Sequence, residues 1–337
     1  MEVCGTHTMC IARSGLAGLL PDELKLISGP GCPVCVTDQS YIDRVLYLAL
    51  ECEPRPIIAT YGDMVRVPGG GGSLAEARAV GARVEVVYSA DQAVDIALAN
   101  GDSEVVFLAV GFETTAPGAA MAVLRARDEN VTNFSIMTAQ KTIPPAMDAL
   151  LSQDDVRIDG FLCPGHVSVI LGWKAYEPIV ATYARPCVVA GFDAPQVLAA
   201  VEAIVAQLTS GQVEAANVYP SVTPDGNPRA IELLDEVFTA SEASWRGLGL
   251  IPDSGLELRE QLAPFDALNR FDPPDFPSRE IPGCRCGDVI CGRLAPIECG
   301  LFGDRCTPRS PVGPCMVSSE GACAAAYKYG PHERGVQ

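Results

Sequence analysis

Short apolar runs alternate with stretches of helical periodicity along most of the chain from residue 24 to residue 211. Runs such as PIIATYGD, VEVVYS and EVVFLAVGF have the length of buried strands, and helical stretches separate them. Residues 38–51 have the pattern of an amphipathic helix with Thr37 or Asp38 as N-cap, and residues 195–211 that of a long helix closed by Ser-Gly. Because strands that alternate with helices indicate βαβ units, we predict an α/β fold with largely parallel sheets.

Two changes in this pattern predict three domains. A polar break at residues 127–133 divides the strands into two groups, which predicts one Rossmann-like α/β domain over residues 1–130 and a second over residues 131–262. Beyond them, the proline-rich stretch FDPPDFPSREIPG indicates a linker, and the cysteine-rich end has little periodicity. We therefore expect a small domain over residues 263–337 that is held by a metal cofactor rather than by an apolar core.

The charge and hydropathy of the chain exclude two classes of partner. A formal net charge of -18 opposes binding to the phosphate backbone of nucleic acids. No uncharged apolar run approaches the roughly 20 residues that a membrane span needs. The first residues also lack the basic and apolar segments of a signal peptide. We therefore expect a cytoplasmic protein that binds neither nucleic acid nor a membrane.

Fourteen cysteines are unusual in a chain expected in the cytoplasm, where thiols stay reduced. Most of them gather near the two ends of the sequence, which indicates metal or redox chemistry. Cys32 and Cys35 form a CxxC motif ahead of the helix predicted over residues 38–51, and a helix N-terminus lowers the pKa of a nearby thiol. This pair could cycle between dithiol and disulfide, supply half of a zinc site, or simply pack in the core.

Cys4 and His7 stand close together in the sequence CGTH, which we expect to form a loop. Such a loop could bring a thiolate and an imidazole onto one metal ion, or let His7 accept the thiol proton. Cys10 follows on a predicted helix, where packing is the simpler explanation. The candidate catalytic residues near the N-terminus are therefore Cys4, His7, Cys32 and Cys35.

The C-terminal cysteines begin with the CxC spacing of CRCGDVICG and continue at irregular gaps, and no CxxC motif occurs among them. Zinc sites usually use paired CxxC or Cys/His ligands, whereas iron–sulfur clusters accept irregular ligation by thiolates alone, so we favour an iron–sulfur domain over a zinc domain. A [4Fe–4S] cluster needs four ligands, and we predict Cys286, Cys299, Cys306 and Cys323. Cys284 and Cys315 remain alternatives, and Cys291 is expected to be buried within a strand DVICG.

Two polar loops at the ends of predicted strands are further candidates. Glu113 in GFETT and His166 in CPGHVS could act as acid–base or ligand-orienting groups, or could serve only as helix caps and loop hydrogen-bond partners. The glycine run VPGGGGS lacks both the lysine of a P-loop and the G-x-G-x-x-G spacing, so nucleotide binding is not the leading hypothesis.

Several long motifs carry a resemblance to one family. MEVCGTHT, GPGCPVCVT, TYGDM, GFETTAP, PGHVS and LFGDRCTPRSPVGPCMVSSEGACAAAY occur in this order over almost the whole chain, which resembles the HypD family of [NiFe]-hydrogenase maturation proteins. Members of that family usually carry a short extension before the MEVCGTH motif, and this chain begins at the motif. The resemblance implies two α/β domains and a C-terminal domain with a [4Fe–4S] cluster.

The resemblance also implies a function and roles for individual residues. Together with the small partner HypC, such a protein is the scaffold on which the Fe(CN)2CO group of the hydrogenase is assembled, with cyanide delivered by HypE. Cys4 would bind the iron with His7 beside it, and Cys32 and Cys35 would be the redox pair. Two other functions remain open from the residues alone, namely a stand-alone iron–sulfur thiol–disulfide oxidoreductase and a zinc-stabilised binding module.

Overall fold

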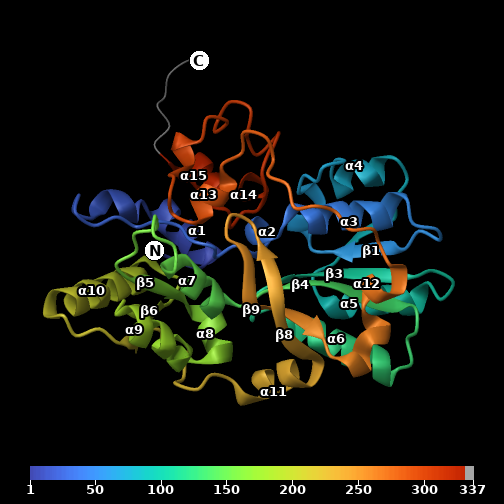
Figure 1. Ribbon diagram of the computed structural model, residues 1–337, viewed down its shortest axis with the longest axis horizontal. Coiled ribbons are helices and arrows are strands. Elements are labelled where there is room, and N and C mark those ends of the chain that lie inside the picture. The colour runs from blue at the N-terminus through green and yellow to red at the C-terminus, as the bar shows by residue number, and fades with distance from the viewer. Residues whose placement is uncertain (331–337) are drawn as a thin grey trace.

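Two parallel sheets and one antiparallel hairpin organise the protein in the computed structural model, which describes residues 1–330 (Figure 1). The first sheet has the strand order β2-β1-β3-β4, and every adjacent pair is parallel. Its strands are β1 (Ile57–Thr60), β2 (Val84–Val86), β3 (Val105–Gly111) and β4 (Phe134–Gln140). All seven residues of β3 are buried because helices cover both faces of the sheet. These helices are α3 (Gln39–Leu50), α4 (Leu74–Ala79), α5 (Ala90–Ala99) and α6 (Ala116–Asp128).

The second sheet is smaller, with the parallel strand order β5-β6-β7. Its strands are β5 (Phe161–Pro164), β6 (Cys187–Ala190) and β7 (Ala215–Asn217). Its helices are α7 (Ile143–Leu151), α8 (Gly165–Leu171), η3 (Trp173–Tyr176), α9 (Glu177–Tyr183) and α10 (Ala194–Ser210). Two parallel sheets flanked by helices confirm the predicted fold class.

The two sheets do not divide the chain at the predicted break. Strand β4 lies beyond residue 130, yet it pairs with β3 over seven residues, so the first sheet extends to Gln140. The first residues of the chain also lie against the second sheet, because Glu2 forms a parallel bridge with Leu162 of β5. Helix α1 (Gly5–Ser14), which leads into η1 (Leu16–Leu19), then packs on α10. The segment that carries the two N-terminal thiol motifs therefore begins beside the second sheet, and its later residues 33–36 contact β3 of the first sheet.

An antiparallel hairpin that the sequence pattern did not predict follows helix α11 (Pro228–Val237). Strands β8 (Phe238–Trp245) and β9 (Gly249–Leu258) pair with each other, and β9 also contacts β4 and α7. The chain continues through η4 (Glu260–Phe265) and α12 (Ala267–Phe271) into the predicted linker, whose residues 272–283 form no helix or strand.

The cysteine-rich end forms a small domain of short helices that lies over α1 and α2 (Pro33–Val36), shown in red in Figure 1. Its elements are α13 (Cys286–Ile290), η5 (Pro296–Glu298), α14 (Pro314–Val317) and α15 (Ala322–Tyr329). Helix α15 packs on α1, and α13 and α14 both contact α2. Over residues 1–330, no helix has the length and apolar character needed to cross a membrane.

Candidate functional site

The two N-terminal thiol motifs lie side by side although about thirty residues separate them. The Gly5 N–H donates to the Gly31 carbonyl at 2.8 Å. A Cβ atom at Gly31 would lie 2.1 Å from the backbone nitrogen of Cys4, so only glycine allows this close approach. The prediction that CGTH forms a loop is wrong, because α1 already begins at Gly5 with Cys4 as its N-cap. The hydrogen bond to Gly31 fixes the backbone there, and the helix starts one residue after the cysteine.

Cys4 is half-buried in an environment that disfavours its thiolate. Burial is the main reason why the pKa of its thiol rises to about 12. The backbone N–H of His7 opposes this shift, and the carboxylates of Glu320 and Glu2 add to it. Glu2 accepts hydrogen bonds from the Cys4 N–H and the Thr8 hydroxyl. A thiolate at Cys4 therefore needs a compensating positive charge, such as that of a bound metal ion.

His7 is fully buried and is held by β6. Its Nε2 lies 2.9 Å from the Gly191 carbonyl and 3.3 Å from the Ala190 carbonyl, so this nitrogen carries the hydrogen. Burial lowers the pKa of His7 to about 4, which keeps the ring neutral. The ring also contacts Phe192, on which His166 stacks with ring centroids 3.9 Å apart. The structure thus anchors His7 at the end of the second sheet, and its catalytic role stays a prediction.

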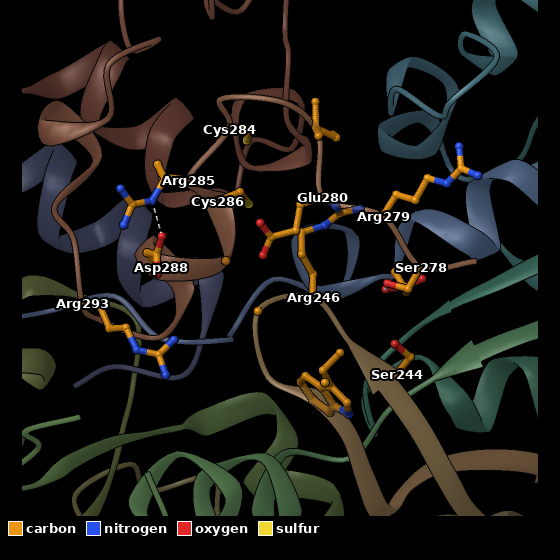
Figure 2. A pocket seen from close by; sticks show the side chains of 16 residues that line it. Ser244, Arg246, Ser278, Arg279, Glu280, Cys284, Arg285, Cys286, Asp288 and Arg293 are labelled. Atoms are coloured by element: carbon orange, nitrogen blue, oxygen red, sulfur yellow. Dashed lines mark hydrogen bonds and ion pairs between the residues drawn. The ribbon is translucent and has the colours of Figure 1, made fainter. Parts of the chain in front are cut away.

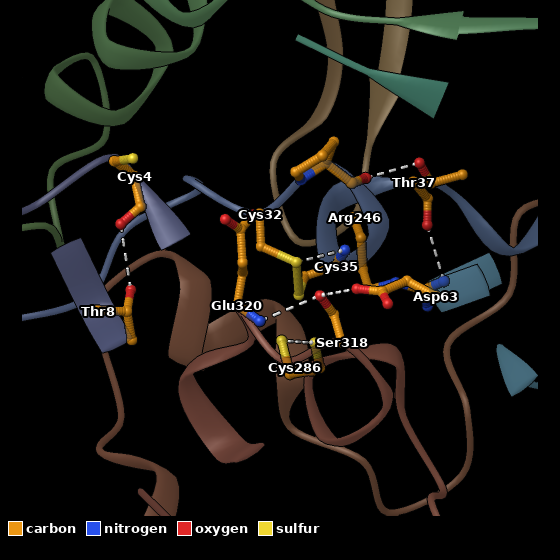
Figure 3. Close-up of a disulfide and its surroundings, with 12 residues drawn as sticks. Cys4, Thr8, Cys32, Cys35, Thr37, Asp63, Arg246, Cys286, Ser318 and Glu320 are labelled. Carbon is orange, nitrogen blue, oxygen red and sulfur yellow. Dashed lines mark hydrogen bonds between the residues drawn. A yellow bond between two sulfur atoms is a disulfide. The ribbon is translucent and has the colours of Figure 1, made fainter. Parts of the chain in front are cut away.

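Cys32 and Cys35 form a buried disulfide on a single helical turn (Figure 3). Cys32 is the N-cap of α2, and its Sγ accepts a hydrogen bond from the Cys35 N–H at 3.1 Å. Pro33 stands at the first position of this helix, where its missing N–H costs nothing. The pair therefore sits on α2, the element that contacts both α13 and α14 of the cysteine-rich domain.

Six thiols of the cysteine-rich domain line one cavity. They belong to Cys284, Cys286, Cys299, Cys306, Cys315 and Cys323. The four predicted ligands and both alternatives are therefore together. The Sγ atoms of Cys286 and Cys315 lie 2.6 Å apart, and hydrogen bonds from the Cys284 and Cys315 thiols lower the pKa of Cys286. No three Cys, His, Asp or Glu side chains in residues 1–330 are already arranged to hold a metal ion. The donor set itself, which consists of thiols around one cavity, fits an iron–sulfur cluster.

Cys291 lies outside this set, as predicted, but not within a strand. It follows the last turn of α13, where its N–H donates to the Gly287 carbonyl. The apolar run VIC is too short to pair as a strand here, and the backbone satisfies its hydrogen bonds locally as one helical turn. The buried Cys291 thiol faces the Gly247 carbonyl at 3.4 Å.

Glu113 joins the two sheets. Its buried carboxylate accepts a hydrogen bond at 2.8 Å from the N–H of Ile143, the first residue of α7, while Oε2 has no partner. Burial raises the pKa of Glu113 to about 7. Of the two interpretations left open for GFETT, this geometry is that of a helix cap.

We expect the substitution Glu113→Gln to remove part of the pH dependence of stability. The folded-state pKa of about 7 exceeds the ordinary 4.5, so the folded protein binds more protons and its stability falls as pH rises through this window. The loss corresponds to about 3 kcal/mol, and a neutral amide avoids it. Urea unfolding at pH 5 and pH 8 measures the difference. The substitution Glu202→Gln at an exposed residue is the control. If the free energy of unfolding changes equally between pH 5 and pH 8 in the parent and in both variants, the assignment is contradicted.

Arg246 is the main site residue that the sequence did not reveal. It lies at the tip of the β8–β9 hairpin and donates to the Thr37 carbonyl at 2.9 Å. It also borders a cavity of about 310 Å³ together with Arg279 of the linker and Arg285 and Arg293 of the cysteine-rich domain (Figure 2). Nothing in the local sequence WRGLG marks this arginine, because its partners are about two hundred residues away.

The fold and the site together define a cysteine-rich α/β protein in which an N-terminal cysteine, a cysteine pair and a six-thiol cavity are carried on elements packed against one another. Residues 1–330 match the HypD family model, described as "Hydrogenase formation hypA family". The chain is 45% identical to the hydrogenase maturation factor HypD of Cupriavidus necator, over 98% of this chain and 89% of the relative. The chain is 43% identical to the hydrogenase maturation factor HypD of Escherichia coli, over 98% of this chain and 88% of the relative. It is 42% identical to a putative hydrogenase expression/formation protein of Methanocaldococcus jannaschii, over 98% of this chain and 91% of the relative. The chain therefore belongs to the HypD family of hydrogenase maturation factors.

Proposed function

We propose that this maturation factor is the scaffold on which, together with a HypC protein, the Fe(CN)2CO group is assembled. The observation that carries the proposal is the position of Cys4. Its thiol is free, half-buried and held by the Gly5–Gly31 hydrogen bond next to the segment that carries the cysteine pair. A thiolate is a soft ligand that suits iron with strong-field cyanide and carbon monoxide ligands. A cysteine of HypC would supply a second thiolate to the same iron, and HypE would deliver the cyanide.

Cys32 and Cys35 would handle electrons beside the assembly site. Reduction of their disulfide takes two electrons and two protons and yields two thiols, and reoxidation returns them. Four of the six thiols around the cavity would hold a [4Fe–4S] cluster, predicted as Cys286, Cys299, Cys306 and Cys323. Such a cluster supplies single electrons when bound. The contacts of α2 with α13 and α14 support this arrangement.

A stand-alone oxidoreductase is less consistent with the burial of the pair. Cys32 is 5% exposed and Cys35 is not exposed. Thiol–disulfide exchange requires an attacking sulfur to reach the disulfide, so an external protein would have poor access to this one. The half-buried Cys4 would also have no role in such an enzyme.

Anaerobic purification with a HypC protein tests the proposal. We expect about four irons and four sulfides from the cluster, further iron in the complex, and infrared bands of bound CN and CO. We expect the Cys4→Ala complex to keep the cluster iron and to lose the infrared bands. Zinc in place of iron and sulfide would favour a structural domain, and infrared bands that persist without Cys4 would show that the iron is bound elsewhere.

A further inference from the structure

The tip of the β8–β9 hairpin, residues 245–249, touches the helix that carries the cysteine pair. The Arg246 N–H donates to the Val36 carbonyl and its guanidinium donates to the Thr37 carbonyl, both at 2.9 Å. Trp245 also forms an antiparallel bridge with Thr37. These contacts hold the C-terminal end of α2, one turn after Cys32 and next to Cys35.

The same tip also touches the cysteine-rich domain. Gly247 has a φ of +80°, and a Cβ atom there would lie 2.5 Å from the Cα of Gly287 in α13. The Cys291 thiol, at the end of the same helix, contacts the Gly247 carbonyl. One short turn therefore packs between the helix of the cysteine pair and the helix that begins at Cys286 (Figures 2 and 3).

The charge of Arg246 is not matched by an ion pair within residues 1–330, and its buried Nε has no hydrogen-bond partner. Of the three other arginines beside the cavity, Arg285 pairs with Asp288 and Arg293 pairs with Asp155. Within residues 1–330, Arg279 forms no ion pair, but no contact with α2 places it at the cysteine pair as Arg246 is placed. The guanidinium of Arg246 is therefore held at the end of α2 by its bond to the Thr37 carbonyl and not by an ion pair, and its charge also acts on the Asp38 carboxyl and the Cys286 thiol nearby. A positive charge next to a cysteine pair favours the reduced state, since that state can carry a thiolate.

We propose that the tip of the hairpin is a clamp that sets the dithiol–disulfide equilibrium of Cys32 and Cys35, with Arg246 as its positioning residue. The inference rests on the redox role proposed for the pair. In the reaction, the Cys32–Cys35 disulfide bond breaks, two glutathione thiols are oxidised to glutathione disulfide, and their two electrons and two protons reach the cysteine pair. Arg246 makes this reduction easier, and the close contact between Gly247 and Gly287 keeps the arginine in place.

The dithiol–disulfide equilibrium of Cys32 and Cys35 can be measured on a single tryptic peptide. Trypsin cleaves after Lys25 and Arg44, and the peptide 26–44 between them contains only Cys32 and Cys35 among the fourteen cysteines. The anaerobically purified holoprotein is equilibrated in glutathione buffers, and the thiols of this peptide are trapped by alkylation and quantified by mass spectrometry. We expect Arg246→Gln to shift the equilibrium toward the disulfide by about tenfold, which corresponds to about 30 mV. Arg246→Lys, which keeps the charge, should shift it less.

Two glycines of the same turn provide a matched comparison. Gly247 and Gly249 both have positive φ, at +80° and +77°, but a Cβ at Gly249 would meet nothing within 4 Å. We expect Gly247→Ala to shift the equilibrium in the direction of Arg246→Gln, and Gly249→Ala to leave it within twofold of the parent.

Two results would overturn the clamp while leaving the redox role of the pair intact. One is that the cysteine pair of the parent exchanges reversibly and the Arg246→Gln variant has the same dithiol–disulfide equilibrium. The other is an equal shift in both glycine variants. If burial keeps glutathione from the parent pair, the same peptide is analysed after reduction with dithionite and methyl viologen, electron carriers that act through the cluster. A parent pair that remains a disulfide under both treatments would overturn the proposed redox role together with the clamp. If Gly247→Ala fails to fold, the comparison of Gln and Lys at Arg246 still decides the question.

Discussion

Replacing Cys4 by alanine is expected to reduce hydrogenase maturation to about one hundredth of the parent level or less, because under the proposed function the iron would lose the thiolate of Cys4. A missing metal ligand commonly costs several kcal/mol of binding free energy, and each 1.4 kcal/mol is tenfold in affinity. The measurement is hydrogenase activity in cells that lack their own copy of this factor and express the variant instead.

Cys10 provides the matched control for Cys4. It lies on the same helix, α1, but its side chain is buried in the apolar cluster that joins α1 to α10. Cys10→Ala should cost about 1 kcal/mol of folding free energy through lost packing and leave maturation near the parent level. Since Cys4 is only half-buried, its own truncation should cost no more stability than this. Maturation that survives Cys4→Ala would show that Cys4 is not the iron ligand. Maturation that fails equally in both variants would show that the loss comes from disturbed packing of α1.

The local structure of this protein could be predicted where the sequence signals its own hydrogen bonds. Asp38, one of the two N-cap residues predicted, caps α3, since its carboxylate accepts from the Ser40 N–H two residues later. Gly211 ends α10 in the left-handed conformation, as the Ser-Gly signal predicted. Such signals depend on neighbours within one turn, so a single sequence is sufficient to find them.

The arrangement of the site could not be predicted in the same way, because it depends on partners far away in the chain. Glu320 reaches α1 through a hydrogen bond from Thr6, across 314 residues. The β8–β9 hairpin has small polar residues such as Ser241 and Ser244, which lack the apolar alternation of a strand, and pairing with a partner strand overrides this weak local pattern. The sequence therefore predicted a set of candidate thiols but not which carboxylates and which arginine surround them.

The six thiols around the cavity differ in their contacts, and these contacts yield two possible ligand sets. The set predicted from the sequence is Cys286, Cys299, Cys306 and Cys323. In the structure Cys284 and Cys315 both contact the Cys286 sulfur, and Cys315 also forms a hydrogen bond with Cys323. The contacts therefore define a second set, in which Cys284 and Cys315 replace Cys299 and Cys306. Both sets contain Cys286 and Cys323.

Single Cys→Ser substitutions separate these sets. Because Cys286 and Cys323 belong to both, we expect either substitution to reduce the iron and labile sulfide of the anaerobically purified protein to near zero. A [4Fe–4S] cluster needs four thiolates, so two of the other four substitutions should also remove it and two should not. Loss at Cys299 and Cys306 would support the set predicted from the sequence, and loss at Cys284 and Cys315 the set defined by contacts. Cys291→Ser is the control, since its thiol is buried in the same domain but lies outside the cavity. If Cys291→Ser loses iron as completely as Cys286→Ser, the losses report disrupted packing rather than missing ligands.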